Sequence, residues 1–134
     1  MDKLLEDWAR HLSAHDTKKF LTLFTDDVVY EDVTFGVVNH GKQQLGAFID
    51  GFFPAFPDIT FELKSGFVAG AWAGMEWLMA GTHKGDLPGM PATGKRCSVR
   101  GATVLELEAG KIKRNSDYWD LATMQKQLGF KPAA

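Results

Sequence analysis

Acidic side chains at the ends of two predicted strands are the best candidates for chemistry in this sequence. Residues 110–119 are typical of a turn followed by a strand, and Asp120 comes directly after them. In a strand, alternate side chains share a face. One face of this strand then carries Arg114, Ser116, Tyr118 and Asp120, and the other carries Asn115, Asp117 and Trp119. If the first face lines a pocket, Asp120 is the candidate catalytic residue and Tyr118 contacts the substrate beside it.

Asp120 allows two interpretations. A carboxylate in an apolar pocket has a raised pKa, because burial disfavours its charged form, and it can then remove a proton next to a carbonyl or activate a water. Asp is also a preferred N-cap residue, and a helix is predicted over 121–128. A cap hydrogen bond from a backbone N–H would instead hold the pKa of Asp120 down.

Tyr30 and Asp32 lie on one side of a strand predicted over 28–33. If Asp32 and Asp120 face one cavity, they cannot both ionise cheaply, so one keeps its proton. Such a pair supplies one acid and one base for proton transfer. Alternatively, Asp32 ends its strand and meets solvent.

Trp77, Met79 and His83 share a face of a strand predicted over 71–83. His83 either relays protons at the rim of a pocket or holds the loop 84–94 by hydrogen bonding. Trp77 and Met79 either line an apolar pocket or belong to the ordinary core.

The order of the predicted elements favours an α+β fold. Helices are predicted over 3–14, 17–24 and 42–56, strands over 59–67, 71–83, 95–107 and 111–119, and a closing helix over 121–128, with a loop at 36–41. The third helix has a wide apolar face that includes Phe48, Phe52 and Phe53. An antiparallel sheet curled around this helix makes a cone with an open mouth, where Phe52 would contact a bound small molecule.

Composition narrows the possible classes of protein. A length of 134 residues predicts one domain over 1–134, and a net charge of −2 without a basic run argues against nucleic acid or an anionic membrane as a partner. Cys97 is the single cysteine, so no internal disulfide and no Cys/His zinc cluster can form. A cytoplasmic protein with no metal site and no membrane span is therefore expected.

The segment from Gly81 to Lys95, GTHKGDLPGMPATGK, resembles the GTHxGxxxGxxPTGK loop of SnoaL-like polyketide cyclases, a family within the nuclear-transport-factor-2-like superfamily. The resemblance covers most of the chain and includes the 27–32 strand and the pieces GKI and YWD that end at Ile112 and Asp120. It implies a conical α+β barrel with an apolar pocket, and a homodimer packed through the outer sheet face. It also implies aldol ring closure without metal or organic cofactor, with an aspartate that matches Asp120 as acid and base.

The wider superfamily includes steroid isomerases, dehydratases and limonene-type epoxide hydrolases. The hydrolase relatives carry Tyr-x-Asn where this chain has Tyr30 and Asp32, and an Arg-x-Asp pair where it has Trp77 and Met79. The resemblance therefore argues against their epoxide chemistry here.

We expect a cofactor-free acid/base enzyme that acts on a small apolar carbonyl compound by aldol cyclisation or isomerisation. Asp120 would be the base, and Tyr30 with a neutral Asp32 or His83 would hydrogen-bond the enolate. The alternatives are a ligand-binding or accessory module without chemistry, and a dehydratase or water-activating hydrolase.

Overall fold

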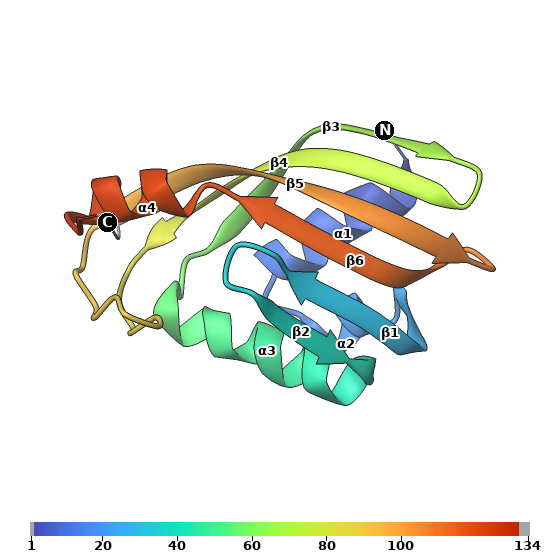
Figure 1. Cartoon of the computed structure of the whole chain (residues 1–134), viewed down its shortest axis with the longest axis horizontal. Coiled ribbons are helices and arrows are strands. Elements are labelled where there is room, and N and C mark those ends of the chain that lie inside the picture. Colours follow the sequence, from blue (N-terminus) through green and yellow to red (C-terminus); the bar gives the residue numbers. More distant parts are fainter. Residues whose placement is uncertain (1, 132–134) are drawn as a thin grey trace.

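Two helices open the chain, a third separates a pair of strands from a run of four strands, and a fourth closes it (Figure 1). The computed structural model describes residues 2–131. The helices are α1 (Lys3–Ser13), α2 (Thr17–Leu21), α3 (Gly41–Ala55) and α4 (Leu121–Leu128). The strands are β1 (Phe24–Asp32), β2 (Val37–His40), β3 (Thr60–Ala69), β4 (Trp72–Thr82), β5 (Arg96–Glu108) and β6 (Lys111–Trp119).

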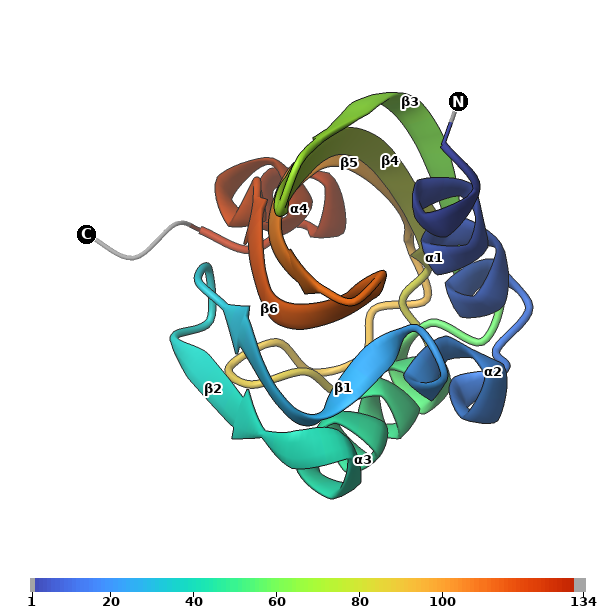
Figure 2. The same ribbon diagram turned by 90° about the vertical axis from the view of Figure 1, so that its right-hand side faces the viewer.

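The six strands form one sheet in the order β2-β1-β6-β5-β4-β3. The β3–β6 part is an antiparallel meander, as predicted, whereas β1 pairs with β6 in parallel. The sheet curls strongly, with α1 packed against β3 and α3 against β1 (Figure 2). This conical α+β arrangement confirms the predicted fold class.

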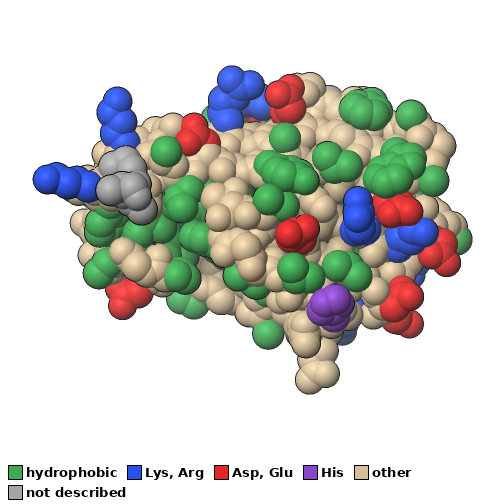
Figure 3. Space-filling view, viewed as in Figure 1, with side chains coloured by type: hydrophobic (Ala, Val, Ile, Leu, Met, Phe, Trp, Pro, Cys, Tyr) green, Lys and Arg blue, Asp and Glu red, His purple; other side chains and the backbone are tan. Residues whose placement is uncertain are grey.

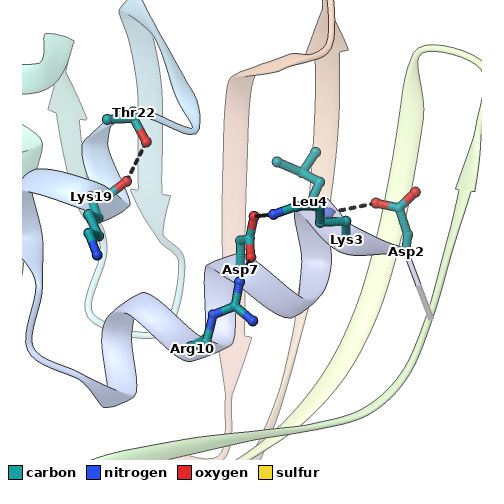
Figure 4. Close-up of polar contacts among 7 residues, drawn as sticks. All are labelled: Asp2, Lys3, Leu4, Asp7, Arg10, Lys19 and Thr22. Atoms are coloured by element: carbon teal, nitrogen blue, oxygen red, sulfur yellow. Dashed lines mark hydrogen bonds and ion pairs between the residues drawn. The ribbon is translucent and has the colours of Figure 1, made fainter.

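Helix α1 is amphipathic because its apolar residues recur at helical spacing. Asp2 caps it by accepting a hydrogen bond from the backbone N–H of Leu4 at 2.8 Å. Asp7 is buried and forms ion pairs with the exposed Lys3 and Arg10 (Figure 4). The apolar residues Leu5, Trp8 and Leu12 are also buried. Trp8 thereby reaches the concave face of the sheet.

Two predicted elements were wrong in this region. The helix expected over 17–24 ends at Leu21, where the Thr22 hydroxyl donates to the Lys19 carbonyl at 2.6 Å (Figure 4), and Phe24 already starts β1. The loop expected over 36–41 contains strand β2, which pairs with β1 as a hairpin. Strand β1 also begins four residues before its predicted start at residue 28, whereas the other predicted elements agree with the structure to within one or two residues. No helix in residues 2–131 is long and apolar enough to cross a membrane.

On the sheet, the ring of a tryptophan packs directly over a glycine of the neighbouring strand. Trp77 on β4 pairs in register with Gly101 on β5. A Cβ atom added at Gly101 would lie only 2.2 Å from the Trp77 ring. The ring therefore lies flat over the neighbouring strand, and only glycine allows it to do so.

We predict that Gly101→Ala lowers the free energy of unfolding by about 1–3 kcal/mol, because the added methyl group displaces the buried Trp77 ring. Urea unfolding measures this loss. Gly51→Ala is the matched control, since nothing lies within 4 Å of that position in α3. The control should gain about 0.5–1 kcal/mol from the better helix former. Equal stability of Gly101→Ala and wild type would contradict the packing described for Trp77.

Candidate functional site

A pocket lies inside the cone, between the concave face of the sheet and the helices α1 and α3. Most of its described lining is apolar or aromatic: Trp8 and Leu12 from α1, Phe48, Ile49, Phe52 and Phe53 from α3, and Trp77 and Met79 from β4. The ionisable groups in that lining are Tyr30, Asp32 and Asp117. These three side chains come from β1 and β6, the two strands that pair in parallel.

The pocket is narrow as it stands. Its free volume is about 50 Å³, enough for a few water molecules, whereas sites for drug-sized ligands usually measure about 300–1,000 Å³. Phe48, Phe52 and Phe53 of α3 line it and are only half-buried. A larger molecule therefore fits only if the pocket widens.

Asp117 is the most elaborately hydrogen-bonded group of the pocket. Tyr30 donates its hydroxyl to Oδ2. Oδ1 accepts from the Thr103 hydroxyl at 2.7 Å and from the side-chain amide of Asn115 at 2.8 Å. All four side chains are buried. The carboxylate is thus held by three donors, which come from β1, β5 and β6.

Two indole rings complete this network. Trp77 donates its Nε1–H to the Thr103 hydroxyl oxygen at 2.9 Å. Trp8 donates its Nε1–H to Oδ1 of Asn115 at 3.1 Å. The polar groups around Asp117 therefore have partners within the protein, as buried polar groups require.

Burial raises the pKa of Asp117 from its ordinary value of 3.8 to about 6, although the hydrogen bonds from Tyr30, Thr103 and Asn115 oppose this rise. The two donors on Oδ1 leave Oδ2 as the oxygen that takes up a proton. The hydroxyl of Tyr30 can turn to accept from that proton. Burial and the nearby Asp117 raise the pKa of Tyr30 well above its usual value, so its hydroxyl stays neutral. Asp117 can therefore exchange a proton with a pocket ligand near neutral pH.

Asp32 is the second carboxyl group of the pocket and pairs in register with Asp117 across the parallel strands. It accepts hydrogen bonds from the indole N–H of Trp119, at 3.1 and 3.2 Å to its two oxygens, and from the backbone N–H of Phe35 at 2.9 Å. Burial raises the pKa of Asp32, and these hydrogen bonds partly oppose it. Asp32 also orients the ring of Trp119, which lines the pocket.

Five residues predicted for the site do line this pocket: Tyr30, Asp32, Phe52, Trp77 and Met79. The structure thus brings Tyr30 and Asp32 of β1 together with Trp77 and Met79 of β4 in one pocket. The roles predicted for these residues stay predictions.

Asp120 and Tyr118 lie elsewhere, so the predicted position of both was wrong. Asp120 is the N-cap of α4 and accepts from the backbone N–H and the hydroxyl of Thr123 at 2.9 and 2.6 Å. These hydrogen bonds lower the pKa of Asp120, and its side chain is exposed outside the pocket. Tyr118 is 49% exposed on the convex face of the sheet. The cap interpretation of Asp120 is the one that its geometry supports.

An irregularity near the start of β6 decides which of its two faces points inward. Leu107 of β5 pairs with Ile112, but Glu106 pairs with Arg114, so β6 holds one extra residue at Lys113. A bulge of this kind shifts the alternation of all later side chains by one. Ile112 and Asp117 consequently both point inward, although they have opposite parity in the sequence.

His83 also lies apart from the pocket. Its ring is fully buried, stacked on Phe56 at 5.5 Å, and its Nδ1 lies 3.1 Å from the Thr93 hydroxyl. Its backbone N–H donates to the carbonyl of Lys95, and its carbonyl accepts from Gly94. His83 therefore holds the 84–94 loop in place. This is the second of the two roles predicted for it, and not that of a proton relay at the pocket rim.

Four residues of the site were not predicted from the sequence: Asp117, Asn115, Thr103 and Trp8. The alternation of Asn115, Asp117 and Trp119 was visible in the sequence. An Asn-x-Asp-x-Trp face has only uncharged neighbours around its carboxylate, whereas the opposite face carries Arg114. That contrast favours the face of Asn115, Asp117 and Trp119 as the buried one.

A curved sheet wrapped around helices, with a pocket on its concave side, defines the ketosteroid-isomerase-like and nuclear-transport-factor-2-like fold. A hypothetical protein of ketosteroid isomerase-like fold from Catenulispora acidiphila DSM 44928, solved with trimethylamine, matches 98% of this chain and 95% of its own, with a TM-score of 0.87 and 21% identity. TsrD from Streptomyces laurentii matches 96% of this chain and 98% of its own, with a TM-score of 0.85 and 22% identity. At these identities, the likeness shows the fold alone.

The chain belongs to the SnoaL-like polyketide cyclase family, whose model matches residues 3–128. Among characterised relatives, the aklanonic acid methyl ester cyclase DauD of Streptomyces sp. strain C5 is 29% identical over 130 residues, which cover 90% of this chain and 78% of that protein. The family membership predicted from the Gly81–Lys95 segment is confirmed.

We predict that Asp117 makes the protein less stable as the pH rises from about 4 to about 6. The folded-state pKa of Asp117 is raised to about 6, so the native state holds a proton that the unfolded state has released. Its stabilising contribution is present below pH 4 and is lost through pH 6. A shift of this size corresponds to about 3 kcal/mol. Denaturant unfolding at several pH values should show this fall in the wild type relative to Asp117→Asn.

Asp120→Asn is the matched control, because the pKa of Asp120 is lowered. Its contribution has the opposite sign and is lost as the pH falls. A constant difference in free energy of unfolding between wild type and Asp117→Asn from pH 4 to pH 7 would mean that the pKa of Asp117 is not raised.

Proposed function

We propose that this protein catalyses an aldol ring closure of a polyketide-type carbonyl compound, with Asp117 as the acid and base. One observation carries the proposal: a buried carboxyl group with its pKa raised to about 6 lies on the wall of a mostly apolar pocket. A pKa near the working pH suits a group that must both remove and return a proton. The family membership and the similarity to an aklanonic acid methyl ester cyclase support this reaction class.

The steps balance with Asp117 alone. Oδ2 of the carboxylate removes a proton from a carbon next to a carbonyl group. The enolate carbon then forms a bond to a second carbonyl carbon of the same molecule, and the new alkoxide takes the proton back from Oδ2. The reaction therefore needs no further proton donor.

Tyr30 is the proposed hydrogen-bond donor to the enolate oxygen. Its hydroxyl already contacts Oδ2 of Asp117, lines the pocket and stays neutral because its pKa is raised. Removal of one donor of this kind typically lowers the rate by about 10²–10³-fold. Asp32 would hold Trp119 against the substrate, since it accepts from the indole N–H of that residue.

We predict that Asp117→Asn lowers turnover by about 10²–10⁴-fold, because the amide cannot serve as the base. The assay follows ring closure of aklanonic acid methyl ester, and exchange of the acidic C–H of this ester with D₂O. Asp120→Asn is the control and should keep activity within about twofold. Full activity of Asp117→Asn, or loss confined to Asp120→Asn, would contradict the proposal.

The second candidate function is a ligand-binding or accessory module. The narrow pocket lined by aromatic side chains favours it. A wild type that binds the ester but neither cyclises it nor exchanges its C–H would establish this alternative, and Trp77→Ala should then weaken binding. A dehydratase or hydrolase would instead eliminate water or incorporate solvent oxygen. The cytoplasmic location stays a prediction.

We propose that the protein forms a homodimer through the convex face of its sheet. Hydrophobic side chains gather over strands β3–β6 on that face (Figure 3). Phe67, Trp72, Val104 and Tyr118 are each at least 44% exposed there, and cross-strand pairing places them on the same side. Contiguous exposed apolar surface of this kind marks interaction sites.

We predict that Trp72→Glu halves the mass measured by sedimentation equilibrium, because a buried unpaired charge is costly at an interface. Lys18→Glu, on the exposed side of α2, is the control and should keep the wild-type mass. A monomeric wild type, or a dimer unaffected by Trp72→Glu, would rule out this interface.

A further inference from the structure

The two indoles behind the Asp117 network fix the direction of its hydrogen bonds. An indole N–H can only donate. The atom that receives the Trp77 N–H, Oγ1 of Thr103, must therefore accept there, and its own proton is free for Asp117. The Trp8 N–H holds Oδ1 of Asn115, so the amide turns its NH₂ group toward Asp117.

We propose that Trp8 and Trp77 are positioning residues that orient Asn115 and Thr103 as donors and thereby stabilise the ionised form of Asp117. This inference rests on the proposed role of Asp117 as the acid and base. Neither indole N–H bonds to Asp117 itself in the structure. Each acts through one intermediate side chain.

The direction of the hydrogen bonds matters because of what Asp117 becomes when it takes up a proton. Asn115 can only donate through its NH₂ group, so Oδ1 cannot carry the proton without opposing it. The Trp77 N–H fills one acceptor site of Thr103, which favours donation by its hydroxyl to Oδ1. Without the indole N–H, the amide of Asn115 can flip and the hydroxyl of Thr103 can rotate. Both changes weaken donation to the carboxylate and raise its pKa.

The titratable groups that face Asp117 are Tyr30 and Asp32 of β1. The other described lining of the pocket, from α1, α3, α4, β3, β4, β6 and Ile59, is apolar or aromatic, and β5 contributes the hydroxyl of Thr103. Within this lining, Tyr30 and Asp32 are the only side chains whose own titration could also shift the pKa of Asp117. The remaining influence on the charge of Asp117 is the set of donors that the tryptophans orient.

Both tryptophans also belong to the aromatic core, where their rings lie 6.0 Å apart. Phenylalanine keeps an aromatic ring in the core but lacks the N–H donor and part of the indole volume. Trp→Phe variants therefore separate positioning from most of the packing. Trp72→Phe is the matched control, since Trp72 is 47% exposed on the convex face of the sheet.

The experiment is NMR titration of the Asp117 side-chain carboxyl carbon in the full chain. Trp8→Phe and Trp77→Phe should each raise its pKa by a few tenths of a pH unit, because a polarised donor is weakened rather than deleted. Thr103→Val deletes a donor to the charged form and should raise the pKa by about one pH unit. Trp72→Phe should leave it unchanged. Unshifted titration in both Trp8→Phe and Trp77→Phe would overturn the proposal.

A double-mutant cycle tests the route of the effect. If Trp77 acts through Thr103, then adding Trp77→Phe to Thr103→Val changes the pKa no further, whereas adding Trp8→Phe still raises it. An equal Trp77→Phe shift with and without Thr103 would overturn the route. Each indole is tested by its own variant, so the failure of one variant to fold leaves the other decisive.

The titration needs no substrate, so its outcome is separable from that of the proposed function. Full activity of Asp117→Asn would remove the catalytic role while leaving the pKa shifts measurable. Unshifted pKa values together with an inactive Asp117→Asn would keep the catalytic role and exclude the indole effect.

Discussion

The enclosure of one carboxyl group, Asp117, is the constraint on which the rest of the site depends. Burial disfavours its charge, and three hydrogen-bond donors restore part of that loss. The balance leaves a pKa of about 6. Burial alone would keep the carboxyl group protonated at neutral pH, and the donors without burial would keep it ionised. A residue that removes and returns a proton needs both influences together.

The curvature of the sheet supplies these donors from three separate strands. The parallel pairing of β1 with β6 brings Tyr30 beside Asp117, and β5 brings Thr103 from the other side. Gly101 lets the Trp77 ring lie close to the sheet, where its N–H reaches Thr103. The bulge in β6 then turns Asp117, and not Tyr118, toward the pocket. Each of these features is a backbone feature with a direct chemical consequence.

Much of the fold was predictable because it rests on local patterns. The helical spacing of Leu5, Trp8 and Leu12 and the alternation along β4 place α1 and β4 correctly. The short strand β2 was missed, since its four residues give too little pattern. The parallel contact of β1 with β6 joins residues far apart in the sequence. No local rule reports such a contact.

The site was predictable only in part for the same reason. Tyr30, Asp32, Trp77 and Met79 were found because their strands keep a regular alternation up to the pocket. Asp117 was passed over because the alternation along residues 114–120 separates two faces without showing which of them is buried, and the bulge before Arg114 that sets this is not visible in the sequence. Asp120 instead showed the ordinary preference of aspartate for a helix N-cap, which the structure displays.

The pH dependence of kcat/KM for ring closure tests the role of Asp117 most directly, because it reports the pKa of the free enzyme's essential base. Activity should rise with unit slope up to about pH 6 and then level off; a limb near pH 4, or none at all, would contradict the assignment of Asp117 as that base.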